Sequence, residues 1–473
     1  MNPALAPAAA LKVCCCAAGP LRPAKGWPLS QMLLICYIIT IVFGTRHVSP
    51  FRHHRVFYQD EQTQDAGHHR LCSSPSLWKL QPMALSEAYI VAARRTALGR
   101  VGGLHGKRRI DDLTAPVIRS VLGDSRINPA LVDGLILGNA TEISNPARLI
   151  SLSSGLPETA TAITIDRQCS SGLDAIVQAC RMIGAGEAEV MLAGGAESLS
   201  TAPWRVARPK HLHQLPRFIG MEAASADAAY EPNLFEASEH LAREAGISRA
   251  EQDGIALRSH LAALAARDAK KFVGEIVPLW NSTEEARDEM VRDLSLEDLE
   301  RQTPFSGTGG LLTAGNTSAQ ADGAAMVIVI SPRIWKDMGE PRALRLMTAA
   351  TIGVAPDREA FGAIAATQRL IGLHNDLDLS QVAAIETSEA SAAQLIQFAR
   401  QFGVDASGIN SGGGAIARGH PFAAAGAVLV VRLFSQLVRA MSTKGDAAGR
   451  GSLGLATLSA IGGLGSAALF QAA

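Results

Sequence analysis

Two side chains in this chain combine a reactive residue type with a position at which it could do chemistry, and the first is Cys169. It stands in the segment Arg167-Gln-Cys-Ser-Ser-Gly-Leu173, at the expected turn from a strand into a helix. The first turn of a helix offers unpaired N–H groups and about half a positive charge, which predicts a stabilised, nucleophilic thiolate. Cys180 falls on the apolar stripe of the same expected helix, so we interpret it as an inert core residue.

The second is His420, in the segment Gly412-Gly-Gly-Ala-Ile-Ala-Arg-Gly-His-Pro421. A lone histidine is more often structural or exposed, but this one follows several glycines and precedes Pro421 at an expected helix start. An imidazole beside Cys169 could take the thiol proton and then hold the oxygen of an acyl group. The pair therefore predicts acyl transfer through a thioester on Cys169.

The elements expected around these residues follow one plan twice. In each half a strand or a glycine-rich segment leads to the reactive residue, a buried helix follows, and a second strand ends at a pair of glycines. These segments are 162–166, the helix after Cys169 and 190–195 in the first half, and 410–414, about 423–439 and 453–463 in the second. A duplicated α/β layer explains this order and would bring both side chains to a pseudo-twofold axis.

From residue 83 to the C-terminus the chain resembles the thiolase family, which includes acetyl-CoA acetyltransferases and 3-ketoacyl-CoA thiolases. Several ordered blocks carry the resemblance, and they are specific together although none of them is specific alone. They are Arg95-Thr96 with Gly99, Cys169-Ser-Ser-Gly-Leu-Asp-Ala175 with Ala193-Gly-Gly-Ala-Glu-Ser-Leu-Ser200, Ser248–Asp253 with Glu275-Ile-Val-Pro278, Thr313-Ala-Gly-Asn-Thr-Ser318 with Asp322-Gly-Ala-Ala325, and Gly419-His-Pro421.

The resemblance implies a five-layered α/β fold, in which two duplicated halves with buried central helices carry an inserted loop domain. We expect the first half at residues 83–200 and 316–338, the loop domain at 201–315 and the second half at 339–473. Ser248-Arg-Ala-Glu251 fits a capping box at the start of a helix in the loop domain. Residues 1–82 differ in texture and hold five of the seven cysteines, so we interpret them as a leader without structure.

The resemblance also implies that coenzyme A thioesters are the substrates, with no cofactor and no metal. In the family a serine of the Ala-Gly-Asn-x-Ser segment touches the coenzyme A arm, which corresponds to Ser318; an ordinary turn serine is the open alternative. The segment from Trp204 reads as a basic loop, and Arg205 and Arg208 in it suit the phosphates of coenzyme A. A solvated surface explains these arginines equally well.

Three residues depart from the family pattern. Ser388 replaces the asparagine that positions an oxyanion-hole water, and Ser459 replaces the second cysteine, which is the acid/base at carbon. Ile461 aligns with the glycine whose backbone N–H completes a second oxyanion hole, so we expect the Ser388 and Ile461 changes to weaken oxyanion stabilisation; a gap in the alignment would instead place Gly462 at this position. A serine hydroxyl is a far weaker acid than a thiol. We therefore expect near-normal acylation of Cys169 but a slow carbon–carbon step.

Composition limits the other classes of function. Formal net charge is zero, with 44 basic and 44 acidic residues, which argues against a general nucleic-acid binder. The apolar run Met32–Phe43 is too short to span a bilayer. We expect a cytoplasmic homo-oligomer with no nucleic acid or membrane as partner. Two alternatives stay open: a thiolase-like acyl-CoA hydrolase or acyltransferase without carbon–carbon chemistry, and a degenerate acyl-CoA-binding protein.

Overall fold

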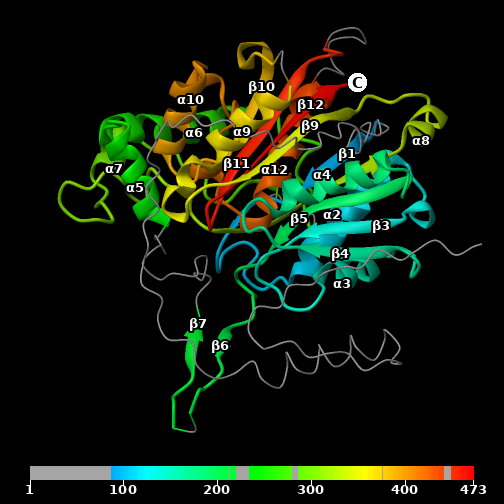
Figure 1. The fold of residues 1–473 in the computed structure, drawn as a ribbon, viewed down its shortest axis with the longest axis horizontal. Helices are drawn as coiled ribbons and strands as arrows, with labels where there is room; N and C mark the ends of the chain where they lie inside the picture. Colours follow the sequence, from blue (N-terminus) through cyan, green and yellow to red (C-terminus); the bar gives the residue numbers. More distant parts are fainter. Residues whose placement is uncertain (1–86, 212, 220–233, 280–285, 375–376, 441–448) are drawn as a thin grey trace, which may run out of the picture. The chain divides into compact units, whose positions relative to one another are not determined.

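The computed structural model describes residues 87–473 except 212, 220–233, 280–285, 375–376 and 441–448 (Figure 1). The expected leader, residues 1–82, lies outside the described residues. A ten-stranded sheet runs in the order β10-β11-β12-β9-β1-β8-β5-β3-β4, with β2 paired to β8. The strands are β1 (Tyr89–Arg95), β2 (Gly99–Arg100), β3 (Gly134–Gly138), β4 (Thr161–Ile165), β5 (Val190–Glu197), β8 (Ala321–Ile330), β9 (Leu344–Gly353), β10 (Val382–Thr387), β11 (Leu453–Ala460) and β12 (Leu464–Ala472).

The sheet consists of two halves that are joined weakly. β1 and β9 pair only through Tyr89 with Arg345 and Ile90 with Leu344. On one side of this junction lies the N-terminal sheet, β1 to β5 with β8, and on the other lies the C-terminal sheet, β9 to β12. The strands of both are rich in small and β-branched residues and are largely buried, as strands covered on both faces must be.

Two buried helices lie between the sheets. α4 (Ser171–Gly184) packs on β3 and β5, α12 (Ala425–Phe434) packs on β11 and β10, and the two helices pack on each other. Glycine permits this approach: a Cβ at Gly172 would lie 2.6 Å from the carbonyl oxygen of Ala423. The segment Phe422–Arg439 is apolar and long enough to cross a membrane, but most of it is buried inside the protein.

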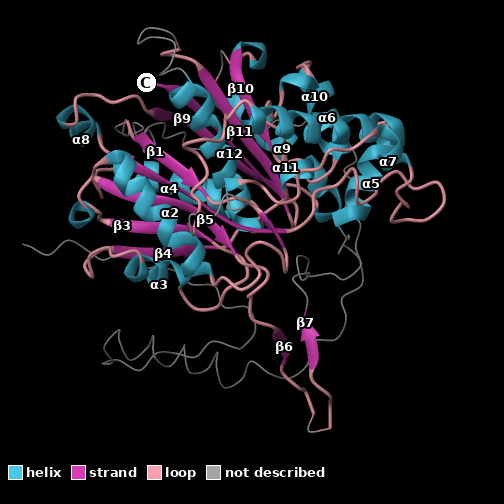
Figure 2. Cartoon of the chain, turned by 180° about the vertical axis from the view of Figure 1, so that it is seen from behind, coloured by secondary structure: helices cyan, strands magenta, loops and turns pink. Residues whose placement is uncertain are grey.

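Helices also cover the two outer faces. α2 (Ile110–Ser125) and α3 (Pro146–Ser153) cover the N-terminal sheet, and α9 (Gly362–Leu373) and α10 (Ala392–Phe402) cover the C-terminal sheet. Figure 2 shows α2 and α3 beside β3 and β4, and α9 and α10 beside β10 and β11. Helix, sheet, central helices, sheet and helix make five layers, so the expected fold class is confirmed.

The inserted region between β5 and β8 holds α5 (Leu234–Glu244), α6 (Arg249–Asp268) and α7 (Leu296–Glu300). The capping box at the start of α6 is confirmed, because Ser248 and Glu251 each accept a hydrogen bond from the other's backbone N–H. The remaining short helices among the described residues are α8 (Pro332–Asp337), α11 (Ala415–Arg418), a π-helical turn Ser435–Arg439 that continues α12, and 3-10 turns at Pro129–Leu131, Pro356–Phe361, Leu379–Gln381, Ala406–Gly408 and Phe422–Ala424.

Two expectations about local structure are wrong. The segment after Trp204, read as a loop, forms a hairpin of β6 (Arg205–Ala207) and β7 (Arg217–Ile219). β5 runs through the pair Gly194-Gly195 to Glu197 and does not end there. The glycines mark a close approach of backbones, since a Cβ at Gly195 would lie 2.4 Å from the carbonyl oxygen of Ala423.

Candidate active site

Cys169 sits on a tight turn between β4 and α4. Gln168, just before it, adopts the left-handed conformation with φ 53°, which is uncommon for a residue other than glycine. Ser171 stabilises the turn, because its Oγ accepts the N–H of Arg167 at 2.8 Å and donates to the carbonyl of Gln168 at 2.6 Å. Strained turns of this kind cluster at functional sites. The turn holds the thiol two residues ahead of the helix.

The expectation that this turn stabilises the thiolate in the free protein is wrong. Burial raises the pKa of Cys169 to about 12, and the carboxyl groups of Glu359 and Glu197 raise it further. Backbone N–H groups of Ile461 and of Cys169 itself oppose this rise in pKa. Only 5% of Cys169 is exposed, so the cost of burying a charge exceeds what the two N–H groups and the helix end provide.

The position of these two N–H groups changes the expectation that Ile461 weakens the second oxyanion hole. A branched side chain there was expected to weaken the second oxyanion hole, but a hydrogen bond to the backbone does not depend on the side chain. The amide of Ile461 reaches the sulfur of Cys169, and the positive φ angles that this turn requires fall on Gly462 and Gly463 instead. Two backbone donors are therefore available to an acyl oxygen on Cys169.

His420 lies on an extended segment that follows α11. Its N–H donates to the carbonyl of Ala319 at 2.8 Å, and its carbonyl accepts the N–H of Ala321 at 3.0 Å. Burial lowers the pKa of His420 to about 4, so the imidazole is neutral at physiological pH. Its Nδ1 has no hydrogen-bond partner among the described residues.

The turn Phe422–Ala424 connects the His420 segment with the Cys169 half. The N–H of Ala423 donates to the carboxylate of Glu197 at 3.4 Å, and the backbone of Ala423 lies against Gly172 and Gly195. Cys169 and Phe422 also belong to one hydrophobic cluster. The two segments that carry the reactive side chains thus meet where α4 and α12 begin.

Ser388 lines a small cavity together with His420. The cavity has a volume of about 20 Å³ and is also lined by Arg418, Thr387 and Leu98. The Oγ of Ser388 is buried without a partner within the described part of the chain, and so are two guanidinium nitrogens of Arg418. The cavity is lined mostly by apolar groups, but three of its lining residues carry buried polar atoms without partners in the described chain, and it has room for about one water molecule.

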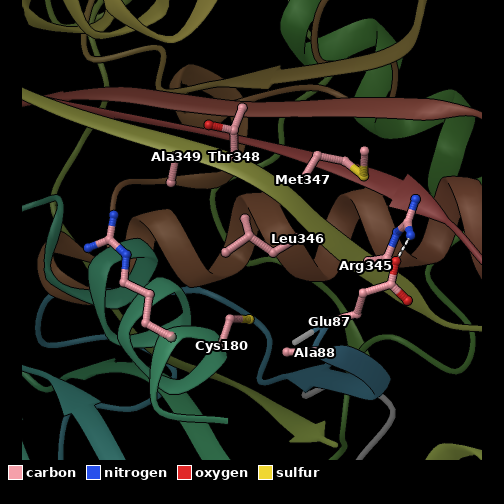
Figure 3. A pocket seen from close by; sticks show the side chains of 9 residues that line it. Glu87, Ala88, Cys180, Arg345, Leu346, Met347, Thr348 and Ala349 are labelled. Atoms are coloured by element: carbon pink, nitrogen blue, oxygen red, sulfur yellow. Dashed lines mark hydrogen bonds and ion pairs between the residues drawn. The ribbon is translucent and has the colours of Figure 1, made fainter. Parts of the chain in front are cut away.

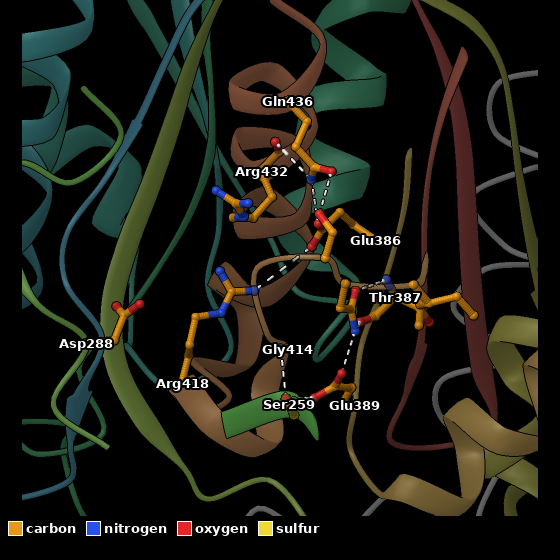
Figure 4. Close-up of polar contacts among 12 residues, drawn as sticks. Ser259, Asp288, Glu386, Thr387, Glu389, Gly414, Arg418, Arg432 and Gln436 are labelled. Carbon is orange, nitrogen blue, oxygen red and sulfur yellow. Dashed lines mark hydrogen bonds and ion pairs between the residues drawn. The ribbon is translucent and has the colours of Figure 1, made fainter. Parts of the chain in front are cut away.

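A buried polar network holds this side of the site (Figure 4). Glu389 accepts hydrogen bonds from Ser259 Oγ at 2.6 Å and Asn410 Nδ2 at 2.9 Å. Gly414 is required beside it, since a Cβ there would lie 2.1 Å from the carboxyl carbon of Glu389. Arg418 pairs with Glu386 at 3.9 Å on the neighbouring strand β10. These contacts fix the loop after β10 and the glycine-rich segment before His420.

Ser459 is buried, and among the described residues its hydroxyl bonds only backbone groups where the 3-10 turn Pro356–Phe361 passes into α9. Its Oγ accepts the N–H of Ala363 at 2.9 Å and donates to the carbonyl of Ala360 at 3.4 Å. The residue that aligns with the family's acid/base at carbon therefore contributes to packing β11 against α9. Its neighbour in space, Glu359, is a titratable group that sequence reasoning missed.

Glu359 lies in the 3-10 turn Pro356–Phe361 and is 3% exposed. Its Oε2 accepts the N–H of Gly462 at 3.2 Å, while its Oε1 is buried with no partner among the described residues. Burial raises the pKa of Glu359 to about 7. In the sequence nothing distinguishes this glutamate from Asp357 nearby, which is exposed. Only the tertiary structure places it beside Cys169.

The expected coenzyme A residues lie in two places. Ser318 is half-buried against the loop that holds Ser388, with its N–H donating to the carbonyl of Ala390 at 3.1 Å. Arg205 belongs to the hairpin and donates to the carbonyls of Ala140 at 2.9 Å and Thr141 at 3.3 Å. It lines a cavity of about 490 Å³ with Trp204 and Gln320, among others. Arg208 is exposed just beyond β6.

Cys180 lies toward the opposite end of α4 from Cys169. It lines a cavity of about 380 Å³ that also holds the ion pair of Arg345 with Glu87 (Figure 3). Burial raises the pKa of Cys180 to about 12, and no histidine lines this cavity. The interpretation of Cys180 as a core residue agrees with this position. Over the described ranges no cluster of His, Cys, Asp and Glu could hold a metal ion.

Comparison with known proteins gives a consistent result. The family model described as "Thiolase, N-terminal domain" matches residues 88–333, and "Thiolase, C-terminal domain" matches residues 341–472. A Staphylococcus epidermidis protein provisionally named acetyl-CoA C-acetyltransferase VraB is 34% identical over 392 residues, which cover 82% of this chain and 99% of that protein.

Solved structures agree with the family models. The crystal structure of the Bacillus anthracis acetyl-CoA acetyltransferase superposes with a TM-score of 0.75 at 30% identity, covering 82% of this chain and 100% of that one. The human mitochondrial 3-ketoacyl-CoA thiolase in complex with CoA superposes with a TM-score of 0.74 at 30% identity, covering 82% and 98% of the two chains.

Proposed function

Because the chain belongs to the thiolase family, we propose that it cleaves or forms β-ketoacyl-CoA, as acetyl-CoA acetyltransferases and 3-ketoacyl-CoA thiolases do. The chain is an acyl-CoA acyltransferase, and the hydrolase and the non-catalytic binder are not favoured. The observation that carries the finer proposal is the position of Cys169. The backbone N–H groups of Ile461 and of Cys169 itself oppose the rise in the pKa of its thiol, and the His420 segment meets the start of α4 next to it.

The proposed reaction starts at Cys169 with His420 as its base. Neutral His420 takes the thiol proton as the sulfur attacks the substrate carbonyl, which compensates for the high pKa of the buried thiol. The N–H groups of Ile461 and Cys169 stabilise the oxygen of the acyl-cysteine. The cavity beside His420 suits one water, through which Ser388 would support the oxyanion in place of an asparagine.

We further propose that coenzyme A enters from the side of Ser318. This serine lies across from the loop that carries Ser388, and its segment pairs with His420. Arg208 is free to meet the phosphates, whereas Arg205 is bound to carbonyl groups of the protein. Arg208→Ala should raise the KM for acyl-CoA more in low salt than in high salt. Equal KM values at every salt concentration would leave Arg208 as an ordinary surface residue.

We also propose that two copies pair along β4. This strand ends the sheet, and Ile163 on it is 46% exposed. Leu149 and Leu152 on the adjoining α3 are 40% and 47% exposed. An unpaired edge beside apolar side chains favours association with a second copy. Light scattering of the wild type should give a multiple of the monomer mass, and Ile163→Lys should shift it toward the monomer.

Steady-state turnover of acetoacetyl-CoA, with and without free coenzyme A, tests the reaction class. Thiolysis requires coenzyme A for loss of the ketone and produces two molecules of acetyl-CoA. Release of free coenzyme A from acyl-CoA alone would instead identify a hydrolase. Binding without any turnover would contradict the proposal.

A further inference from the structure

One proton transfer in the proposed reaction has no assigned group. Condensation must remove a proton from the α-carbon of the second acyl-CoA, and thiolysis must return one to it. Ser459 cannot do this while its hydroxyl is engaged by Ala363 and Ala360. A group near Cys169 with a free oxygen and a pKa near neutrality would satisfy the requirement.

Two buried carboxyl groups act electrostatically on Cys169, and their surroundings differ. Glu197 accepts four hydrogen bonds at its carboxylate, from the side chains of Asn139 and Thr141 and from the N–H groups of Ala140 and Ala423. Glu359 accepts one hydrogen bond, from the N–H of Gly462, and its Oε1 has no partner among the described residues. A fully bonded carboxylate stabilises the fold, whereas an unbonded buried oxygen is costly and calls for a functional explanation.

Consecutive peptide groups place Glu359 beside the nucleophile. Ile461 packs against the hydrophobic cluster that contains Cys169, and its backbone N–H opposes the rise in the pKa of that thiol. The next N–H, that of Gly462, donates to Oε2 of Glu359 at 3.2 Å. Consecutive residues of the turn between β11 and β12 therefore face the thiol and the carboxyl group, and Glu359 contributes to the raised pKa of Cys169.

Backbone packing keeps Glu359 in this place. A Cβ at Gly463 would lie 2.2 Å from the carbonyl oxygen of Val354, and one at Gly465 would lie 2.0 Å from that of Gly362. The N–H of Val354 donates to the carbonyl of Gly463 at 2.7 Å. The turn that carries Glu359 thus lies directly on the turn after β11, which is the arrangement a positioned acid/base needs.

We propose that Glu359 is the acid/base that moves the proton at the α-carbon, in the place of the missing second cysteine. This inference rests on the proposed thiolase function and assigns one further catalytic residue to it. In condensation the Glu359 carboxylate takes the α-proton, and the carbanion attacks the carbonyl of acyl-Cys169. The new carbon–carbon bond forms, the carbon–sulfur bond breaks, and the sulfur leaves as a thiolate, which then takes the proton held by Glu359 so that the carboxylate is regenerated.

Thiolysis runs the same steps backwards. The Cys169 thiolate attacks the β-carbonyl, the carbon–carbon bond breaks, and its electron pair takes the proton of neutral Glu359 to give acetyl-CoA. The two groups then share one negative charge at every stage. When Cys169 is a thiolate, Glu359 holds the proton, and when Cys169 is acylated, Glu359 can ionise without repulsion.

Cys169 faces Glu359 from the turn before α4. α5 packs against the turn of Glu359 and carries Glu236 and two paired acids: Glu244 pairs with His240 and Arg358, and Glu239 pairs with Arg243. The turn 461–465 carries no titratable side chain, and His420 stays neutral. Proton exchange at the α-carbon of acetyl-CoA should therefore rise with pH through about 7, the pKa of Glu359, because the carboxylate is the active form.

The test separates acylation from carbon chemistry. The wild type, Glu359→Gln and Ser459→Ala would each be mixed with deuterated acetyl-CoA, followed by mass spectrometry of acetyl on Cys169 and of deuterium loss to water. Glu359→Gln keeps the shape and an acceptor for Gly462, so acetylation should stay within a few-fold of wild type. Its deuterium loss and its thiolysis, per acetylated site, should fall about 10²–10⁴-fold. Ser459→Ala should retain both.

Each contrary outcome is distinct. Wild-type protein that is acetylated but never thiolyses would contradict the proposed function, whatever Glu359 does. A thiolase whose Glu359→Gln variant exchanges deuterium like the wild type would overturn only the role of Glu359. The wild-type protein gives a second test, which does not depend on the folding of Glu359→Gln. If the rate of wild-type deuterium exchange does not change between about pH 6 and 8, the role of Glu359 is overturned.

Discussion

The two halves of the molecule have the same plan, but only the first keeps the residue types of the family pattern at its site positions. The N-terminal half places Cys169 on a turn before α4, where its own N–H and that of Ile461 from the C-terminal half oppose the rise in the pKa of the thiol. The C-terminal half supplies His420 from the corresponding place but carries Ser388 and Ser459 where the family pattern has asparagine and cysteine. The difference indicates that the groups that accept an acyl group, drawn from both halves, are retained, whereas the altered positions of the C-terminal half concern the carbon acid, so the two steps can change separately.

Removing the nucleophile should have the largest effect. Cys169→Ala should abolish the acyl-enzyme and lower turnover by at least about 10⁴-fold, because no other described cysteine lies beside a base. Cys180→Ala is the matched control. This variant should be acylated fully on Cys169, because the thiol of Cys180 lies toward the other end of α4 and takes no part in the reaction. Intact mass after exposure to acetyl-CoA measures both. An acetyl group on Cys180 would contradict the assignment of Cys169 as the nucleophile.

Removing the base should rank next. His420→Ala should slow acylation of Cys169 by about 10²–10⁴-fold, the usual contribution of a positioned base. Because burial lowers the pKa of His420 to about 4, protonation of this imidazole should not slow wild-type acylation between about pH 6 and 8. Stopped-flow acylation across this range measures it. A loss of rate with a midpoint near 6.5 would show that His420 titrates as an exposed histidine.

Ser388 offers a smaller effect that is confined to the altered half. Ser388→Ala removes a buried hydroxyl from a residue that lines the small cavity beside His420, so it should lower thiolysis by about tenfold or less, in proportion to one hydrogen bond. The rate of acylation should change less. Steady-state thiolysis beside single-turnover acylation gives the two numbers. Equal losses in both would place Ser388 in the acylation machinery.

Ser459 should have the smallest effect on activity. Ser459→Ala leaves the N–H of Ala363 without its acceptor and should lower the free energy of unfolding by about 1–2 kcal/mol while turnover changes only a few-fold. Ser459→Cys should bring no gain in condensation, since Glu359 is the proposed base. Denaturant unfolding and acetyl-CoA condensation measure these. A large gain in Ser459→Cys would show that the site lacks a base.

Sequence patterns were sufficient where chemistry depends on local structure. The strand–turn–helix around Cys169, the helix after His420 and the capping box at Ser248 follow from periodicity and cap residues, and all three are present. The high pKa of Cys169 could not be predicted, because it depends on burial and on carboxyl groups more than a hundred residues away or on another strand. Glu359 was missed for the same reason.

The altered positions show a second limit. An alignment identifies a residue but not the group that performs its task, so Ile461 was expected to weaken an oxyanion hole that its backbone N–H completes. Ser459 was expected to leave the carbon–carbon step without a base, and the expected slow condensation followed from that. The structure assigns Ser459 to packing and places Glu359 beside the nucleophile. A lost side chain at one position can be compensated from a neighbouring segment.

One single-turnover experiment tests the central claim that Cys169 accepts an acyl group through cleavage of a carbon–carbon bond. The protein would be mixed with acetoacetyl-CoA in the absence of free coenzyme A and then quenched for peptide mass spectrometry. The account predicts acetyl on the peptide that contains Cys169 and one acetyl-CoA released per acetylated site. Acetoacetyl on Cys169 with no acetyl-CoA, or acetyl on any other residue, would contradict it.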